Sequence, residues 1–234
     1  MKIALLGYGK MGKTIETIAI HRGHEIVLKT STSPSQELKN ADVAIDFSIP
    51  SAAVNNISQA LNNNIPVISG TTGWLDDFNT IETLCQEKNG AFIYASNFSL
   101  GVNIFFELNR TLAKMMSNLA DYNVDIEEIH HTQKLDAPSG TAISLANDIV
   151  ENHKDYNNWE LDGDAKSVLP ITAKRIENVP GTHTINYTSE VDTITIEHTA
   201  HSRQGFALGA VIAAEWIIGK KGIFTMKDVL NIGQ

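Results

Sequence analysis

The fold follows from residues 2–12, which read K-I-A-L-L-G-Y-G-K-M-G. Residues 3–6 form a short apolar run that ends at a glycine, which predicts a buried strand. Residues 11–22 then place apolar side chains at the spacing of one helix face. The pattern G-x-G-x-x-G lies between this strand and this helix, where the main chain can approach a pyrophosphate bound at the helix N-terminus. The stretch therefore favours a dinucleotide site over an ordinary glycine turn.

The same alternation of strand and helix continues through the first hundred residues. Further strands are expected at residues 25–28, 41–47, 65–69 and 91–95, and further helices at 51–62 and 76–88. Strands that alternate with helices form a parallel sheet with right-handed crossovers. The first part of the chain is therefore predicted to be an α/β domain with a Rossmann-like, doubly wound parallel sheet.

The pattern changes after residue 97. Helices are expected at residues 103–117 and 141–152, and strands at 124–130, 171–176, 182–188 and 191–199. The last two strands predict an antiparallel hairpin, so the second domain is α+β with a mixed or antiparallel sheet. A strongly apolar helix follows at 206–218, and Thr225 and Asp228 resemble a capping pair for one more helix. We expect these helices to return to the first domain. The predicted domains are then 1–101 plus 206–234 for dinucleotide binding, and 102–205 for substrate binding and oligomerisation.

Composition limits the partners and the compartment. The net charge of the 234 residues is −9, which argues against a general nucleic-acid binder or a protein of anionic membranes. The N-terminal apolar run is too short for a signal peptide or a membrane span. Cys85 is the one cysteine, so an internal disulfide is not possible and a reducing compartment fits. We expect a cytoplasmic protein.

The loops that follow three of the strands concern the cofactor. Residues 69–73 and 96–99 are rich in Gly, Ser, Thr and Asn, and they lie where ligands of open α/β sheets bind, although turn chemistry alone also selects these residues. The end of the second strand carries Lys29 in place of the acidic residue that grips a ribose 2′-hydroxyl. Lysine removes the repulsion of a 2′-phosphate, which predicts a modest preference for NADPH with NADH still accepted. A solvated Lys29 without effect is the alternative.

Residues 127–142, E-E-I-H-H-T-Q-K-L-D-A-P-S-G-T-A, concern the substrate. Ser139 is a good N-cap, and the free N–H groups of a helix start bind anions. Lys134 adds positive charge, and histidine suits proton transfer near neutral pH. If His130 and His131 lie at a strand end, they point to opposite faces and have different tasks. The stretch thus indicates an anionic substrate beside a proton donor, with a surface His pair and a solvated lysine as the alternative. No metal is expected, because no third ligand stands at a standard spacing.

The pattern E-x-H-H-x-x-K-x-D-A-P-S-G-T-A resembles the signature of the 4-hydroxy-tetrahydrodipicolinate (dihydrodipicolinate) reductase family. The resemblance covers nearly the whole chain. It includes G-Y-G-K-M-G, D-F-S at 46–48, G-T-T-G at 70–73, N-F-S-L-G-V-N at 97–103, H-x-A-x-S-R at 198–203 and G-I-F-T-M-K-D-V-L at 222–230. It implies reduction of a cyclic dicarboxylate by NADH or NADPH, with loss of water, to tetrahydrodipicolinate in lysine biosynthesis. It also implies a homotetramer built through the sheets of the second domain.

The resemblance also assigns residues. His130 matches the acid/base histidine and Lys134 the proton-donating lysine, while His131, Gly140 and Thr141 match substrate contacts. The matches to cofactor contacts are Gly7, Tyr8, Gly9, Lys10, Met11, Gly12, Gly70, Thr71, Thr72, Ser96, Asn97, Phe98 and Ser99. The chain departs from many members in a shorter segment at 30–40 and in the missing acidic ribose residue. Two rival hypotheses are another nicotinamide-nucleotide dehydrogenase, acting on a small amino or semialdehyde acid, and a nucleotide-sensing protein without turnover.

Overall fold

The computed structural model describes residues 1–31, 36–202 and 204–233, so part of the 30–40 segment and Arg203 of the H-x-A-x-S-R match lie outside the described residues. The chain forms two compact units. Unit 1 comprises Met1–Leu100 and Gln204–Gln234, and unit 2 comprises Gly101–Arg203. Unit 1 is thus built from two segments of the chain, whereas unit 2 is continuous in sequence.

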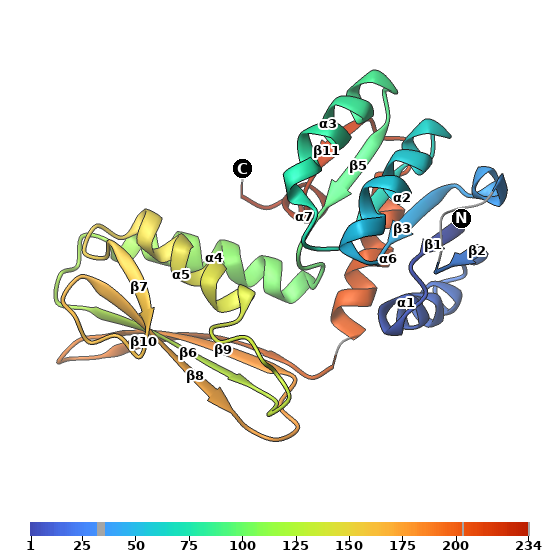
Figure 1. Cartoon of the computed structure of the whole chain (residues 1–234). Coiled ribbons are helices and arrows are strands. Elements are labelled where there is room, and N and C mark those ends of the chain that lie inside the picture. Colours follow the sequence, from blue (N-terminus) through green and yellow to red (C-terminus); the bar gives the residue numbers. More distant parts are fainter. Residues whose placement is uncertain (32–35, 203, 234) are drawn as a thin grey trace. The chain divides into compact units, whose positions relative to one another are not determined.

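Unit 1 contains a six-stranded parallel sheet in the order β11-β5-β4-β3-β1-β2 (Figure 1). The strands are β1 (Lys2–Leu6), β2 (Glu25–Thr30), β3 (Val43–Asp46), β4 (Val67–Ser69), β5 (Ala91–Tyr94) and β11 (Gly222–Phe224). β1 pairs with β2 on one side and with β3 on the other, so the strand order reverses at β1. Ligands of such sheets bind at this reversal, outside the carboxyl ends of the strands. The predicted doubly wound parallel sheet is confirmed.

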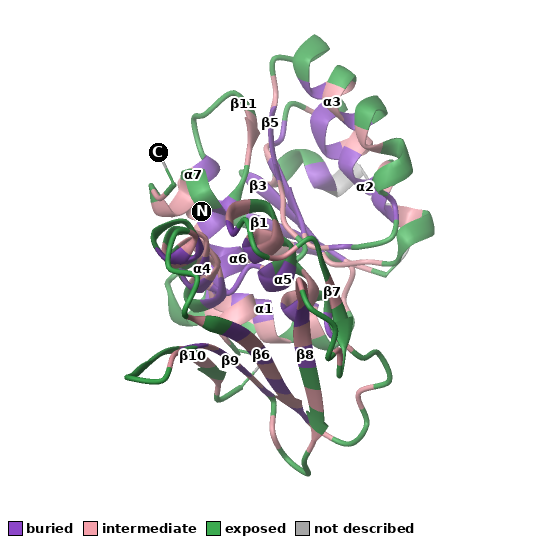
Figure 2. Ribbon diagram, turned by 90° about the vertical axis from the view of Figure 1, so that its left-hand side faces the viewer, coloured by how far each residue is buried: buried purple, intermediate pink, exposed green. Residues whose placement is uncertain are grey.

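Helices cover both faces of this sheet. One face packs against α1 (Lys10–His21) and α6 (Gln204–Ile217), and the other against α2 (Pro50–Asn62) and α3 (Phe78–Glu87). Successive side chains of a strand point to opposite faces, so Leu5 lies in the first core and Leu6 in the second. The apolar sequence of α6 is explained by its position, because half of its 14 residues are buried (Figure 2).

The helix α6 packs closely against the loop after β5. Gly209 of α6 lies against the loop after β5, since a Cβ atom on it would be 1.7 Å from the carbonyl oxygen of Phe98. Only glycine permits this close approach of helix and loop.

The last helix, α7 (Met226–Leu230), begins with a capping box of Thr225 and Asp228, which confirms the predicted capping pair.

Unit 2 contains a five-stranded mixed sheet in the order β10-β9-β6-β8-β7 (Figure 1). The strands are β6 (Asn123–His130), β7 (Asn158–Leu161), β8 (Val168–Arg175), β9 (Gly181–Thr188) and β10 (Thr193–Ala200). β6 lies at the centre, antiparallel to β9 and parallel to β8. The helices α4 (Leu100–Met116) and α5 (Gly140–Asn152) build the core with inward side chains of β6, β8 and β9. β10 is largely exposed, and the predicted hairpin of β9 and β10 is confirmed.

The two short strands β7 and β11 were not predicted from the sequence. Each has only three or four residues, N-W-E-L and G-I-F, which is too few for a recognisable alternation. Within the part of the chain that the structure describes, no helix is both long enough and apolar enough to cross a membrane.

Candidate active site

The glycine loop between β1 and α1 needs glycine for two different reasons. Gly7 has a φ of +102°, and a Cβ atom on it would lie 2.1 Å from the carbonyl oxygen of Phe47. A Cβ atom on Gly12 would lie 2.4 Å from the carbonyl oxygen of Gly7, so the start of α1 touches the loop. Gly9 differs, because no described atom lies within 4 Å of the place where its Cβ would be. The outer glycines shape the loop, and the middle one leaves room for a ligand.

A cavity of about 350 Å³ opens beside Gly9. It brings together two of the predicted loops, because Gly9, Lys10, Met11, Gly70, Thr71 and Thr72 all line it. Phe47, Ser48 and Pro50, which follow β3 and were not predicted, complete the lining. In the structure, Gly9 is the N-cap of α1 and no side chain caps the helix, so its first N–H groups are available to an anion. The cavity therefore fits the phosphates of a dinucleotide.

A buried carboxylate connects the two loops of this cavity. Asp46, the last residue of β3, is fully buried and accepts four hydrogen bonds of 2.7–2.9 Å. Ser48 and Asn56 donate to one oxygen, and Ser69 and Thr71 donate to the other. Thr71 also accepts a hydrogen bond from the main-chain N–H of Ser48. Asp46 thus fixes the ends of β3 and β4 relative to each other.

The loop after β5 has a different environment. Phe98 is buried in the core of unit 1, with its ring 5.7 Å from that of Phe47. The side chain of Asn97 accepts a hydrogen bond from the main-chain N–H of Ser99. None of the described residues 96–99 lines the cavity beside Gly9. Of the predicted cofactor residues, Gly9, Lys10, Met11, Gly70, Thr71 and Thr72 therefore share this cavity, whereas residues 96–99 do not line it.

The end of β2 carries a charged cluster next to the glycine loop. Lys29 Nζ lies 3.1 Å from Glu16 Oε1 and 5.1 Å from the centre of the Tyr8 ring. The Tyr8 hydroxyl donates a hydrogen bond to the same carboxylate of Glu16. Glu16 comes from α1 and was not singled out from the sequence. The lysine predicted to select the cofactor is therefore paired with an acid.

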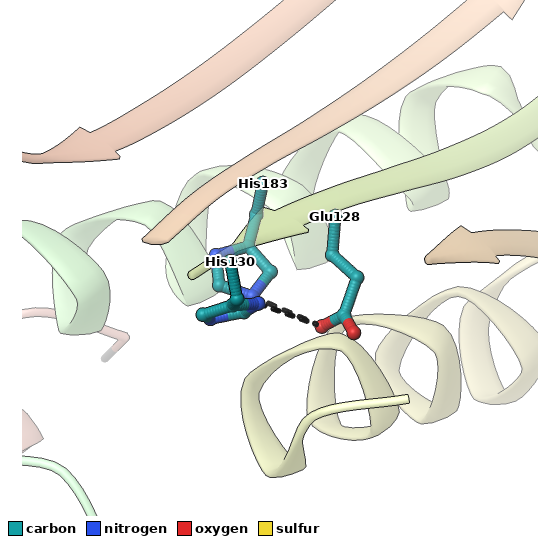
Figure 3. Close-up of side chains that lie close together, drawn as sticks. All are labelled: Glu128, His130 and His183. Atoms are coloured by element: carbon teal, nitrogen blue, oxygen red, sulfur yellow. Dashed lines mark ion pairs between the residues drawn. The ribbon is translucent and has the colours of Figure 1, made fainter. Parts of the chain in front are cut away.

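In unit 2 the end of β6 presents two buried polar side chains on one face. Glu128 and His130 are two residues apart, so they point to the same side of the strand, and His183 reaches them from β9 (Figure 3). Glu128 Oε2 lies 3.5 Å from His130 Nδ1 and 3.7 Å from His183 Nε2. The His130 ring packs against Gly181, where a Cβ atom would be 3.0 Å from Nε2.

Glu128 also ties down the segment that carries the other predicted residues. Its Oε2 accepts a hydrogen bond of 3.0 Å from the main-chain N–H of Ser139, and Arg175 donates to Oε1 at 3.3 Å. Arg175 further donates to the carbonyl oxygen of Asp136 at 2.6 Å and, at 3.4 Å, to that of Lys134. Glu128 therefore holds the α5 end of the loop that joins β6 to α5 directly, and the middle of this loop through Arg175.

The start of α5 has the Ser139 cap that the sequence predicts. The Ser139 side chain caps the helix by accepting from the N–H of Ala142, and no described atom crowds the Cβ position of Gly140. Lys134 Nζ lies 2.8 Å from both carboxylate oxygens of Asp136. The positive helix start and Lys134 belong to the same short segment.

The two histidines of the H-H pair lie in different environments. β6 ends at His130, which is 7% exposed, and His131 is the first residue outside the strand and only half-buried. That the two side chains have different tasks stays a prediction. His130 alone joins the cluster with Glu128 and His183.

Burial and charge set the protonation of the cluster. Burial alone would raise the pKa of Glu128, but contacts with His183 and Ser139 outweigh burial and bring that pKa down to about 2. Burial is the main reason that the pKa of His130 falls to about 4. The Glu128 carboxylate opposes this change, and the charges of Lys134 and Arg175 add to it. Near neutral pH the site therefore contains an ionised Glu128 and a neutral His130.

Glu128, His130 and His183 are residue types that bind metals, and their ligand atoms lie within 4.8 Å of one another. Both carboxylate oxygens of Glu128 already accept hydrogen bonds, and Arg175 places a positive charge beside them. The Nδ1 atoms of His130 and His183 are buried without a hydrogen-bond partner among the described residues, and the positive charge of Arg175 opposes the binding of a cation here.

Acidification should show the cost of keeping His130 neutral. A histidine whose pKa is lowered on folding takes up protons more readily in the unfolded chain, so stability is lost as the pH falls from 6.5 to about 4. Between about pH 7.5 and about pH 5, His130→Gln should lose about 2 kcal/mol less unfolding free energy than the wild type. Urea unfolding at both pH values measures this difference, with His21→Gln at an exposed position as control. Equal losses in wild type and His130→Gln would contradict the prediction.

The uncapped start of α1, the open Gly9 and the doubly wound sheet together place the chain among the nicotinamide-nucleotide-dependent oxidoreductases. Comparison with known families gives the particular one. Residues 1–98 match the family model "Dihydrodipicolinate reductase, N-terminus" and residues 101–230 match "Dihydrodipicolinate reductase, C-terminus". The chain belongs to the dihydrodipicolinate reductase family.

Individual relatives agree with this assignment. A 4-hydroxy-tetrahydrodipicolinate reductase of Christiangramia forsetii is 59% identical over 234 residues, covering 99% of this chain and 98% of the relative. One of the same name from Methanocaldococcus jannaschii is 35% identical, covering 98% of this chain and 82% of the relative. Among solved structures, a dipicolinate-bound dihydrodipicolinate reductase from Paenisporosarcina sp. TG-14 has a TM-score of 0.78 and 25% identity, covering 96% of this chain and 97% of that one. The predicted family resemblance is confirmed.

Proposed function

We propose that this chain reduces 4-hydroxy-tetrahydrodipicolinate to tetrahydrodipicolinate, with loss of water, in the diaminopimelate and lysine pathway. The observation that carries this proposal is the 59% identity to a relative of that name across both units. The dipicolinate-bound structural relative supports a small dicarboxylate as the substrate. We assign nucleotide binding to unit 1 and substrate binding to unit 2. The single cysteine and the pathway support a cytoplasmic location.

Unit 2 binds and orients the dicarboxylate. The N–H groups at the start of α5, at Gly140 and Thr141, hold one ring carboxylate, and His131 adds a further contact. Lys134 exchanges the carboxylate of Asp136 for a carboxylate of the substrate. The exchange is possible because Asp136 is largely exposed. The loop keeps its shape during this exchange, since Arg175 holds it through main-chain atoms. The substrate is thereby fixed in one orientation.

Proton transfer is assigned to Lys134 and His130. The dihydronicotinamide supplies a hydride when bound, and the negative charge that builds on the substrate must be neutralised by a proton. Lys134 carries that proton as an ammonium group. His130 is neutral in the absence of substrate, but a bound dicarboxylate is a nearby negative charge, which raises the pKa of an imidazole. His130 therefore takes up a proton with the substrate and assists Lys134.

Unit 1 has the features that a nicotinamide nucleotide requires. The cavity beside Gly9 and the uncapped start of α1 accept the phosphates, and we assign the remaining contacts to the glycine loop, to Gly70–Thr72 and to residues 96–99. Lys29 at the end of β2 supports a modest preference for NADPH, about tenfold or less, because exposed charge pairs contribute little. NADH remains a substrate.

The test of the function is an assay with the product of a dihydrodipicolinate synthase. NADPH and NADH absorbance should fall when this product is added, and tetrahydrodipicolinate should form. Oxidation only with a different small amino or semialdehyde acid would indicate the rival dehydrogenase. Nucleotide binding without any turnover would indicate a sensing protein.

The exposed strand β10 supports a homotetramer. In the described chain β10 is an edge strand of its sheet, and its apolar residue Ile194 is 39% exposed. Strand edges of this kind are usually covered or paired. We expect multi-angle light scattering to give four times the 25.6 kDa mass of the chain. A monomer at micromolar concentration would contradict the assembly.

A further inference from the structure

The cluster of Tyr8, Glu16 and Lys29 lies at the place where Rossmann-type sites recognise the adenosine ribose. Lys29 is the fifth residue of β2, and its neighbour Thr30 accepts a hydrogen bond of 2.8 Å from the N–H of Gly7. The end of β2 is thus joined directly to the glycine loop. The acidic residue that often ends this strand is missing, but Glu16 supplies a carboxylate from α1.

Each member of the cluster contacts the other two. Glu16 Oε1 lies 3.1 Å from Lys29 Nζ, the Tyr8 hydroxyl donates to Glu16, and the ammonium group stands over the Tyr8 ring. The side chain of Glu16 is 19% exposed, while that of Lys29 is 44% exposed and accessible to a ligand. The hydrogen bond from the Tyr8 hydroxyl holds the Glu16 carboxylate in place.

The charges of the cluster cancel. The hydrogen bond with Glu16 raises the pKa of Lys29, and the hydrogen bonds from Tyr8 and Lys29 lower the pKa of Glu16. Both side chains are therefore charged near neutral pH, and their sum is zero. A 2′-phosphate that approaches Lys29 also approaches Glu16, which repels it. A 2′-hydroxyl meets no such opposition and can donate to the Glu16 carboxylate.

We infer that Glu16 is a specificity-determining residue for the cofactor, which restrains Lys29 and so limits the preference for a 2′-phosphorylated nucleotide. This inference rests on the proposed nicotinamide-nucleotide function. It explains how one strand-end lysine leaves both nucleotides usable. Lys29 attracts a phosphate, Glu16 weakens that attraction, and the balance between the two sets the preference.

The test uses binding without turnover. Isothermal titration measures the dissociation constants of adenosine 2′,5′-bisphosphate and of adenosine 5′-monophosphate, which differ only in the 2′-phosphate. Glu16→Gln keeps the size of the side chain and an acceptor for Tyr8. It should bind the bisphosphate about three- to tenfold more tightly relative to the monophosphate than the wild type does, and raised salt should reduce this gain. A Lys29→Met background should abolish the gain, since the two residues act together.

The matched control is Glu25→Gln, which removes one negative charge from the other end of β2. It should leave the ratio of the two dissociation constants unchanged. An unchanged ratio in Glu16→Gln, or an equal change in Glu25→Gln, would overturn the role of Glu16 while leaving nucleotide binding intact. Failure of the wild type to bind either adenosine nucleotide would instead overturn both this inference and the proposed cofactor.

Discussion

Lys134→Ala and His130→Ala are each expected to lower turnover by about 10²–10⁴-fold, the range of a positioned acid or base. The reason is geometric as well as chemical. Lys134 belongs to the loop that Arg175 clamps, and His130 is enclosed by Glu128 and Gly181. Water cannot replace either group in a fixed orientation. Stopped-flow and steady-state measurements of NADPH oxidation give kcat for each variant.

Cofactor affinity should change little in these variants, because both residues belong to unit 2. Lys174→Ala is the matched control, because it removes another lysine of unit 2. Lys174 lies next to Arg175 on β8, but its side chain pairs with Glu127 and is half exposed. It should keep wild-type turnover. A double variant of His130→Ala and Lys134→Ala with near-normal turnover would disprove the assignment. Loss of nucleotide binding in the single variants would point to misfolding and not to chemistry.

Glu128→Ala is also expected to lower activity strongly, although Glu128 is assigned no contact with the substrate. Its carboxylate holds His130, the N–H of Ser139 and, through Arg175, the loop of Lys134. Removing it leaves buried donors without acceptors, which costs about 2–3 kcal/mol of unfolding free energy. We expect kcat/KM to fall by about 10²-fold or more, since small displacements of catalytic groups are costly.

Glu128→Gln removes the negative charge of Glu128 but keeps the size and shape of its side chain. It keeps an acceptor for Ser139 and should recover most of the stability. The charge of Glu128 raises the pKa of His130, so Glu128→Gln should move the alkaline limb of the kcat profile, where His130 loses its proton, to lower pH. Glu127→Gln, one residue earlier on the other face of β6, is the control and should shift nothing. An unshifted profile in Glu128→Gln would show that Glu128 is structural only.

The sequence was sufficient for features that depend on near neighbours. Apolar periodicity predicted the doubly wound sheet, and residue type predicted the caps at Ser139 and at Thr225. The strand at 124–130 was also predicted, and it ends at His130 as expected. These elements are specified within a few residues, so one sequence contains the information.

The partners of the site residues could not be predicted, because they depend on strand register. Glu128 stands opposite His183 in the antiparallel pair of β6 and β9, and His130 stands beside Arg175 in the parallel pair of β6 and β8. A shift of one residue would separate both pairs. Glu128 belongs to the family signature and could have been singled out by its spacing of two from His130. Nothing near His183 in the sequence indicates such a role.

The return of the chain to unit 1 has a consequence for biosynthesis. α6 supplies the apolar side chains that cover one face of the first sheet, yet it follows the whole of unit 2 in sequence. At the usual rate of translation, Gly101–Arg203 takes about 5–20 s to synthesise. During that time α1 alone covers this face of the nascent sheet of unit 1, and the part that α6 will cover is exposed to chaperones and to other chains. Unit 2, although it is made later than the first strands, is the first part of the protein that can complete its fold on the ribosome.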